Sequence, residues 1–303
     1  MKEQYKPYVV SADANLLLRG WSQKNGLSIP SEGYFQGMLS ELNTVLAEYF
    51  GTSEVIPEQV LQQGLRKFVR ESPLPVVSLD RAYLSSSDKL LGFLDATRTV
   101  DSQLQNTGLG SRATELSLQR QIGKLAVQAN GSPIALLDDV VFEGKTVLSI
   151  IEEFRRRGVA VDRVYAGITL QEGKELLEAN GVRVESVIDP YKQVIDEVCE
   201  RDFRVGVPLS GRTIVSGGQT TGAPYLKPFG KPEEWASIPT DKVQEFSLFC
   251  LYQSLSLWAQ IEKRSQQDVS PQSLAKPVQG LPNEKSMTQA VRASIKQLQQ
   301  GEV

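Results

Sequence analysis

Histidine is absent from the 303-residue sequence, and cysteine occurs only twice. The lack of an imidazole excludes Ser-His-Asp and Cys-His catalysis, as well as every zinc site that needs a histidine ligand. Cys199 and Cys250 lie far apart in the chain, so they predict buried thiols and not a disulfide framework. Any metal ion should therefore be a hard cation held by oxygen atoms, with Mg²⁺ as the first candidate.

Two further features are missing, namely an apolar run of the roughly 20 residues that cross a bilayer, and an excess of basic residues. The chain has 33 Lys and Arg against 36 Asp and Glu, which gives a formal net charge of -3. This balance provides no global field for nucleic acid, and neither nucleic acid nor a membrane is an expected partner. Residues 1–6 lack a signal-peptide core, so the cytoplasm is the expected location.

The most informative stretch is residues 133–158. An apolar run at 134–137 predicts a buried strand, and Asp138 and Asp139 follow it directly. A turn containing Gly144 leads to a helix that begins at about Thr146 and stops at Gly158. The helix has one apolar stripe, formed by Val147, Ile150, Ile151 and Phe154.

This arrangement of strand, acidic pair, turn and helix can hold a phosphorylated sugar. Free N–H groups of the turn and of the first helical turn can point at a phosphate, with the positive end of the helix dipole behind them. Lys145 adds a charge and Thr146 adds a hydroxyl donor. Asp138 and Asp139 can accept hydrogen bonds from vicinal hydroxyls or help to hold a hydrated Mg²⁺. The pattern suits a ribose 5-phosphate that carries further phosphate.

The same residues resemble the PRPP-binding signature of the type I phosphoribosyltransferases. The resemblance implies that Asp138 and Asp139 contact the ribose hydroxyls as catalytic residues and bind Mg²⁺ indirectly. It also implies a 5-phosphate loop, formed by Glu143, Gly144, Lys145, Thr146 and Val147. Glu143 stands where the family usually has Thr. Phe142 stands where hypoxanthine-guanine enzymes carry Asp, which argues against 6-oxopurine salvage.

An ordinary turn between a strand and a helix, in a doubly wound sheet without PRPP chemistry, has the same pattern. A P-loop is excluded, because the first glycine of its motif falls on Asp139. Strand and helix patterns alternate over residues 133–188, which predicts parallel βαβ units with right-handed crossovers. We therefore expect an α/β fold with a three-layer, mostly parallel twisted sheet flanked by helices. Its ligand should lie at the carboxyl ends of the strands.

The sequence predicts four parts. Residues 1–73 form a strand and a helical cap on the core, and residues 74–198 form the phosphoribosyltransferase-like core. Residues 199–264 form a C-terminal helical extension, and the resemblance implies that it includes a hood in which Arg201, Arg204 and Arg212 are candidates to contact an acceptor. Residues 265–303 are rich in Gln, Ser, Pro and Lys and predict a mostly disordered tail with at most a short helix at 291–298.

Three other arginines are candidates for contacts with pyrophosphate or for a lid. Arg81 follows a short apolar strand at 75–79, and its guanidinium fork suits phosphate. Arg98 and Arg112 lie in the polar, Gly-containing segment 95–112, which predicts a mobile loop that can close over a ligand. Orotate-type enzymes close a basic, Gly-bearing loop at a similar place. A surface arginine or a bare connection explains each position equally well.

The resemblance implies a Mg²⁺-dependent enzyme that transfers ribose 5-phosphate from PRPP to a nucleobase or related nitrogen acceptor and releases pyrophosphate. The alternative is a non-catalytic regulatory protein of the same fold that binds PRPP or a nucleotide. A third hypothesis is a structural protein with a vestigial site. The expected partners are PRPP, a small nitrogenous acceptor and a second copy of the chain in a homodimer.

Overall fold

The computed structural model describes residues 6–86, 88–112, 116–216 and 219–301. The chain forms two compact units. Unit 1 contains Ile56–Thr97 and Leu109–Val194, and unit 2 contains Lys6–Val55, Arg98–Gly108 and residues 195–301. The division falls at other places than the boundaries that the sequence indicates at residues 73, 198 and 264, because each unit combines separate stretches of the chain.

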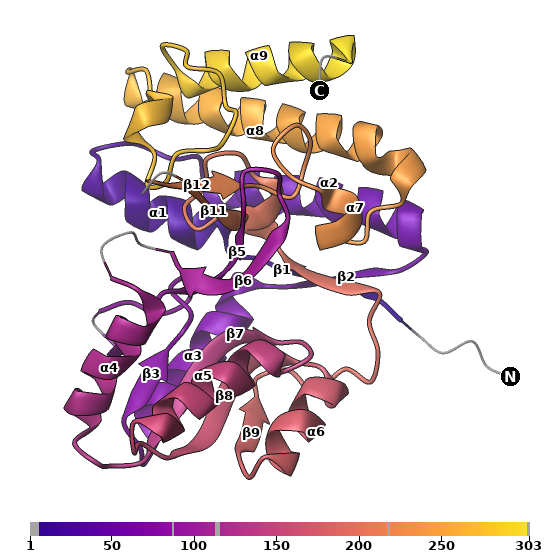
Figure 1. Cartoon of the computed structure of the whole chain (residues 1–303). Helices are drawn as coiled ribbons and strands as arrows, with labels where there is room; N and C mark the ends of the chain where they lie inside the picture. Colours follow the sequence, from indigo (N-terminus) through magenta and orange to yellow (C-terminus); the bar gives the residue numbers. More distant parts are fainter. Residues whose placement is uncertain (1–5, 87, 113–115, 217–218, 302–303) are drawn as a thin grey trace, which may run out of the picture. The chain divides into compact units, whose positions relative to one another are not determined.

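A five-stranded sheet forms the centre of unit 1 (Figure 1). Its order is β4-β3-β7-β8-β9, and each pair of neighbouring strands is parallel. The strands are β3 (Val76–Ser78), β4 (Gly92–Phe93), β7 (Ile134–Val141), β8 (Val161–Thr169) and β9 (Arg183–Ser186). The apolar run that begins β7 is fully buried, as expected of a strand covered on both faces. The predicted parallel α/β sheet is confirmed.

Helices cover both faces of this sheet. Phe68 of α3 (Glu58–Glu71) stacks on Tyr165 of β8, with the ring centroids 4.9 Å apart. Successive strand residues face opposite sides, and Val164 belongs to the apolar core on the other face, which includes Phe154 and Ile122. The helices on that face are α4 (Leu118–Ala129), α5 (Lys145–Arg156) and α6 (Gln171–Ala179). The result is the expected three-layer arrangement.

Helix α3 lies in unit 1, although the sequence assigns it to an N-terminal cap. A Cβ atom on Gly64 would lie 2.4 Å from a methyl carbon of Val187, so the glycine allows the helix to approach the loop after β9 closely. Leu61 and Leu65 are fully buried. Helix α3 is therefore an integral layer of the parallel sheet.

Unit 2 contains two further sheets, with orders β10-β1-β2 and β12-β11-β5-β6. Strands β1 and β10 are parallel, whereas β11 and β12 are antiparallel. The strands are β1 (Tyr8–Ser11), β2 (Ser53–Ile56), β5 (Ala96–Val100), β6 (Asn106–Ser111), β10 (Asp196–Cys199), β11 (Arg212–Ser216) and β12 (Gln219–Ala223). The boundary between the units runs through β5 and β6.

The helices of unit 2 are mostly long. They are α1 (Ala14–Lys24), α2 (Glu32–Phe50), α7 (Pro232–Trp235), α8 (Val243–Ser265) and α9 (Met287–Gln300), with short 3₁₀ turns η1 (Glu200–Phe203), η2 (Thr240–Lys242) and η3 (Pro271–Ser273). Gly51 ends helix α2 in the left-handed conformation with a φ of 77°.

The predicted mobile loop at 95–112 is wrong, because β5 and β6 occupy most of this segment. Thr97 and Thr99 are buried on β5, and the Thr107 hydroxyl of β6 donates to Thr99 Oγ1 at 2.9 Å. Threonine suits a half-buried strand despite its polarity. Helix α4 begins at Leu118, and residues 113–115 lie outside the described part of the chain.

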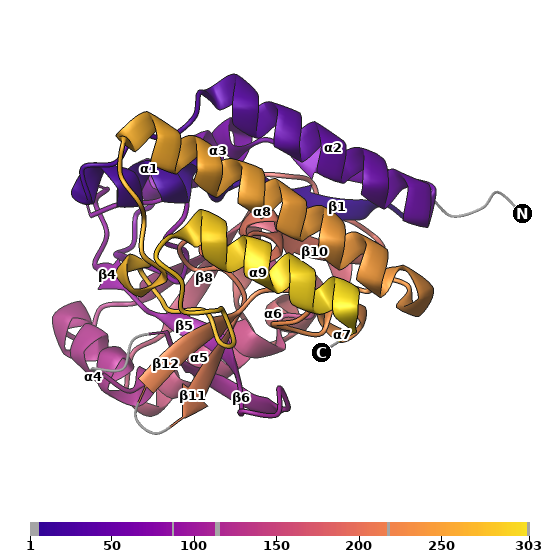
Figure 2. The same ribbon diagram turned by 90° about the horizontal axis from the view of Figure 1, so that it is seen from above.

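The predicted disordered tail is also wrong. Helix α9 runs beside α8 (Figure 2) and is longer than the short helix expected at 291–298. Its buried face contains Met287, Ala290, Val291, Ser294, Ile295 and Leu298. This spacing forms an apolar stripe that the many glutamines conceal in the composition. Residues 302–303 lie outside the described part of the chain.

Candidate functional site

The acidic pair lies at the carboxyl end of β7, the central strand of the parallel sheet. Asp138 and Asp139 belong to the strand itself, which continues to Val141. Both side chains are half-buried, and the Asp139 N–H donates to Asp138 Oδ1 at 3.0 Å. The sequence predicts the pair directly after the buried apolar run, and the structure confirms this position. In open parallel sheets, ligands bind at the carboxyl ends of the strands.

Burial and neighbouring acids change the proton affinity of Asp138. Loss of solvent raises the pKa of Asp138 well above its usual value, and the side chain and charge of Asp139 and the charge of Asp80 raise it further. A cation or a hydroxyl donor placed beside the pair would stabilise the ionised form. The site is therefore suited to a ligand that brings positive charge or several hydroxyl groups.

Asp80 is a member of this edge that the sequence analysis did not single out. It follows β3, whose neighbour in the sheet is β7, and its side chain is buried. Its carboxylate accepts hydrogen bonds from the N–H groups of Ala82 and Tyr83, at 2.8 Å and 2.9 Å. An aspartate directly after a predicted strand was the available signal, since such residues often fix the following turn through backbone N–H groups.

The turn between β7 and α5 has a fixed shape. Gly144 precedes α5 and has a φ of 76°, which is strained for a residue with a side chain. A Cβ on Gly173 of α6 would lie 2.2 Å from the Phe142 carbonyl oxygen, and one on Gly144 would lie 2.9 Å from the Gly173 carbonyl oxygen. Backbone thus packs on backbone here, and Gly173 is a second site residue that sequence reasoning missed.

The first N–H groups of α5 have no partner within the helix, because a helix leaves its first-turn donors unpaired. They belong to Lys145, Thr146 and Val147. The Thr146 side chain is half-buried and Val147 is buried. Unpaired donors of this kind can bind anions at helix N-termini, and the assignment of these residues to a 5-phosphate loop stays a prediction.

Lys145 is paired within its own loop. Its Nζ lies 2.8 Å from Glu143 Oε2, and both side chains are exposed. The hydrogen bond and charge of Glu143, with a smaller effect of Glu172, raise the pKa of Lys145. Glu143 thus offsets the only cation that the predicted loop, residues 143–147, contains.

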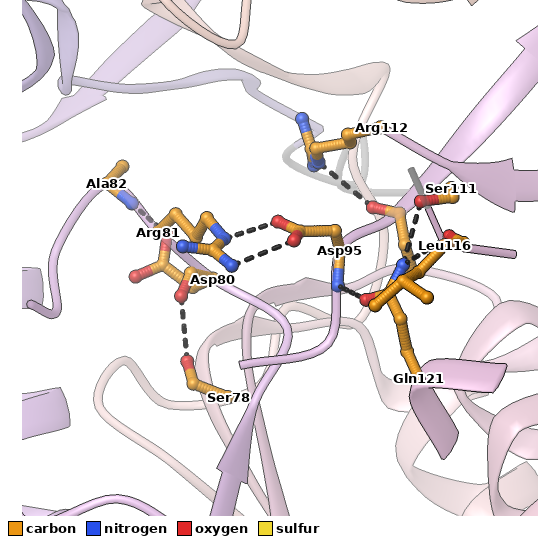
Figure 3. A network of polar contacts seen from close by, with 10 residues as sticks. Ser78, Asp80, Arg81, Ala82, Asp95, Ser111, Arg112, Leu116 and Gln121 are labelled. Carbon is orange, nitrogen blue, oxygen red and sulfur yellow. Dashed lines mark hydrogen bonds and ion pairs between the residues drawn. The ribbon is translucent and has the colours of Figure 1, made fainter. Parts of the chain in front are cut away.

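Arg81 is also paired (Figure 3). Its Nε and Nη2 donate to the two carboxylate oxygens of Asp95, with the Nη2–Oδ2 distance at 2.8 Å. Its guanidinium carbon lies 4.6 Å from the centroid of the Phe93 ring. The guanidinium, predicted to contact pyrophosphate, is therefore held by a carboxylate and an aromatic face.

Gln121 of α4 fixes the other side of Asp95. The Asp95 N–H donates to Gln121 Oε1 at 2.9 Å, and the Gln121 amide donates to Ser111 Oγ and to the Leu116 carbonyl oxygen. Arg112 donates through Nε to the Ala96 carbonyl oxygen at 3.0 Å. The side chain of Arg112 is thus part of the same polar network.

The remaining arginine candidates lie in unit 2. Arg98 is exposed on β5. The hood candidates Arg201 and Arg204 are buried, and they form ion pairs with Asp13 and Glu200, respectively. Arg212 is also buried, with its guanidinium carbon 4.6 Å from the centroid of a Trp235 ring. In unit 2 these buried guanidinium groups contact carboxylates and an aromatic ring.

The donor set at the end of β7 fits Mg²⁺ held partly by a ligand. Among the described side chains, no three or more from Asp, Glu and Cys form a group that can hold a metal ion. Mg²⁺ is commonly bound by one or two carboxylates together with waters and substrate phosphates. Asp138 and Asp139 are suited to that role. Burial is the main cause of the raised pKa of Asp138, and an added cation would offset the further effect of the Asp139 and Asp80 charges.

The sequence matches no family model, and the search of curated proteins returned no match. Among solved structures, orotate phosphoribosyltransferase from Aeropyrum pernix is similar over 46% of this chain and 69% of its own, at 18% identity and a TM-score of 0.26. UMP synthase from Leishmania donovani is similar over 46% of this chain and 27% of its own, at 14% identity and a TM-score of 0.27. Orotate phosphoribosyltransferase from Mycobacterium tuberculosis, solved with PRPP, is similar over 43% and 71%, at 11% identity and a TM-score of 0.23.

These structures are two orotate phosphoribosyltransferases and a UMP synthase. At such TM-scores the likeness does not by itself assign an activity. The α/β assignment rests on the strand order and parallel registers of unit 1. Within the described ranges, no helix is long and apolar enough to cross a membrane.

Proposed function

We propose that this protein is a Mg²⁺-dependent phosphoribosyltransferase-like enzyme that uses PRPP. It would transfer ribose 5-phosphate to a nitrogen atom of a nucleobase or related acceptor and release pyrophosphate. One juxtaposition supports the proposal above all. Asp138 and Asp139 lie near the end of the central strand β7, and the left-handed turn at Gly144 leads from there to the N-terminus of α5.

In the proposed complex, the first N–H groups of α5 and the Lys145 ammonium bind the 5-phosphate. Asp138 and Asp139 accept hydrogen bonds from the ribose hydroxyls. The bond between the anomeric carbon and the pyrophosphate oxygen breaks, and its electron pair leaves with pyrophosphate. The acceptor nitrogen then forms a bond to the anomeric carbon and releases its proton to solvent water. The nearby carboxylates stabilise the positive charge that develops on the ribose, so catalysis rests mainly on positioning and electrostatics.

Asp138 and Asp139 would hold Mg²⁺, and the ion would supply neutralisation of the leaving group's charge. The chain's own part is to keep two carboxylates beside the ribose and to present backbone donors to the phosphate. Arg81 lies after the neighbouring strand β3 and is the candidate contact for pyrophosphate.

A non-catalytic protein that binds PRPP or a nucleotide is the second candidate function. The observation that favours it is that Lys145 and Arg81 are each already paired with a carboxylate. Such pairing reduces the charge available to stabilise a leaving group, while it still permits a phosphorylated ligand to bind through the backbone donors of α5.

Calorimetry with PRPP and Mg²⁺, followed by an assay of pyrophosphate release against a panel of nucleobases, tests the proposal. We expect saturable binding and base-dependent release in the wild type, and neither in an Asp138→Asn, Asp139→Asn double variant. Glu153→Gln is the matched control, because Glu153 pairs with Arg156 and Arg157 at the far end of α5. Binding without release would support the regulatory function, and absence of binding would contradict both functions.

A further inference from the structure

Both cations at the candidate site are held by carboxylates of the same edge. Asp95 follows β4, Arg81 follows β3, and Glu143 and Lys145 follow β7. These three strands are adjacent and parallel, so the residues that follow them lie at one edge of the sheet. The edge therefore contains two ion pairs, Arg81–Asp95 and Glu143–Lys145.

The Arg81–Asp95 pair has the form of an anion complex. Two nitrogen atoms of the guanidinium fork donate to the two oxygens of one carboxylate, which is the geometry in which arginine also binds phosphate. The hydrogen bond from the Asp95 N–H to Gln121 and the Phe93 ring under the guanidinium fix both partners. The Asp95 carboxylate thus takes the position on Arg81 that a phosphate group would take.

The Glu143–Lys145 pair repeats this arrangement at the 5-phosphate turn. Glu143 and Lys145 flank Gly144, and their charged groups are 2.8 Å apart. Their side chains remain 49% and 73% exposed, so a ligand in solution can reach Lys145 and replace the glutamate. Each cation therefore has an internal anion as its partner before any ligand arrives.

We propose that Glu143 and Asp95 are specificity-determining residues that act as internal competitors, Glu143 against the 5-phosphate and Asp95 against the pyrophosphate. This inference rests on the proposed function. Each ligand phosphate must displace one carboxylate from its cation, so a single phosphate contributes only a small net free energy of binding. Ligands with one phosphate bind weakly, and a ligand with phosphate groups at both positions is retained.

The two residues should affect different ligands. Glu143→Gln should raise the affinity for ribose 5-phosphate and for PRPP about two- to fivefold, the factor that corresponds to an exposed ion pair. Asp95→Asn should raise the affinity for pyrophosphate and PRPP by a similar factor of roughly two to five, without effect on ribose 5-phosphate. Both gains should shrink at high salt, because exposed charges are screened.

Calorimetry of the full chain with ribose 5-phosphate, pyrophosphate and PRPP, each with Mg²⁺, measures these effects. Glu153→Gln removes a paired carboxylate from the far end of α5 and should leave all three affinities unchanged. Asp95→Asn keeps the backbone N–H that binds Gln121. If it nevertheless fails to fold, Glu143→Gln still tests the proposal, because both side chains of the Glu143–Lys145 pair are exposed.

Unchanged affinities in both variants would overturn the inference, as would an Asp95→Asn variant that binds ribose 5-phosphate more tightly. In either case, PRPP binding by the wild type leaves the proposed function standing. Absence of PRPP binding in the wild type and in every variant would overturn both.

Discussion

At the scale of single residues, the acidic pair of β7 differs from ordinary surface aspartates. Loss of solvent is the main cause of the raised pKa of Asp138, and the side chain of Asp139 and the charge of Asp80 raise this pKa further. A group that binds its proton more tightly in the folded state than in the unfolded state stabilises the fold below its unfolded pKa, which is about 4 for aspartate. The contribution is lost as the pH rises through the raised pKa.

Asp138→Asn should therefore stabilise the protein at pH 8, because asparagine does not pay the cost of ionisation in a half-buried site. The advantage over the wild type should shrink as the pH falls toward 5, where a larger fraction of Asp138 is protonated. Thermal unfolding of both proteins across this range measures the difference. Glu178→Gln, at an exposed position on α6, is the control and should show no such trend. A destabilised Asp138→Asn protein at pH 8 would contradict the prediction.

The sequence was sufficient to locate the acidic pair and the turn, because adjacent aspartates after an apolar run and a glycine before a helix are local signals. It was not sufficient to find Asp95. Its partner Arg81 is 14 positions away, and the contact depends on β4, which has only two residues and no hydrophobic pattern of its own. Gly173 was missed for a similar reason, since only the packing of α6 against Phe142 shows why that position needs a glycine.

At the scale of elements, the contact between α6 and the turn before α5 determines the shape of the candidate phosphate loop. Gly173→Ala should weaken PRPP binding by moving the turn, and should destabilise the protein by roughly 1–3 kcal/mol, as overpacking does. Gly37→Ala is a matched control on the exposed side of α2, where an added methyl contacts nothing within 4 Å. It should stabilise the protein by about 0.5–1 kcal/mol. Calorimetry and urea unfolding measure both effects, and PRPP binding unaffected by Gly173→Ala would contradict this role of the contact.

Helix α9 provides a second prediction at this scale. Ile295 is buried on the face of α9 that packs along α8, whereas the next residue, Lys296, is exposed. Ile295→Ala should cost about 2–5 kcal/mol of stability, as expected for truncation of a core isoleucine. Lys296→Ala should have little effect. Urea unfolding monitored in unit 2 distinguishes them, and equal stabilities would indicate that the packing of α9 is not needed.

The helix after the acidic strand was predictable from its apolar stripe, and the structure places the start of α5 within one residue of the expected position. Strands β5 and β6 were not, because their alternating positions contain threonines and glycines instead of apolar residues. In α9 the stripe is present, but alanine and serine occupy part of it and glutamines surround it. Composition then indicates disorder, while tertiary packing stabilises a helix.

At the scale of the whole molecule, all parts of the proposed PRPP site described above, apart from Arg98, belong to unit 1. PRPP with Mg²⁺ at 100 times its Kd should stabilise the binding unit by about 2.7 kcal/mol, which corresponds to a roughly 100-fold slowing of amides that exchange through its unfolding. Hydrogen exchange should show this slowing in β7 and α5 and not in α9. Equal slowing in both places would contradict a site confined to unit 1.

The interleaving of the two units has a consequence for any attempt to take the protein apart. The chain leaves unit 1 after Thr97 and re-enters it at Leu109, and the first described stretch of unit 1 begins at Ile56. A fragment that starts at residue 74 would lack Leu61 and Phe68, and with them the layer that covers Gly167 and Tyr165. No uninterrupted segment of the chain contains either unit alone, so truncation at a single position cannot separate the two units.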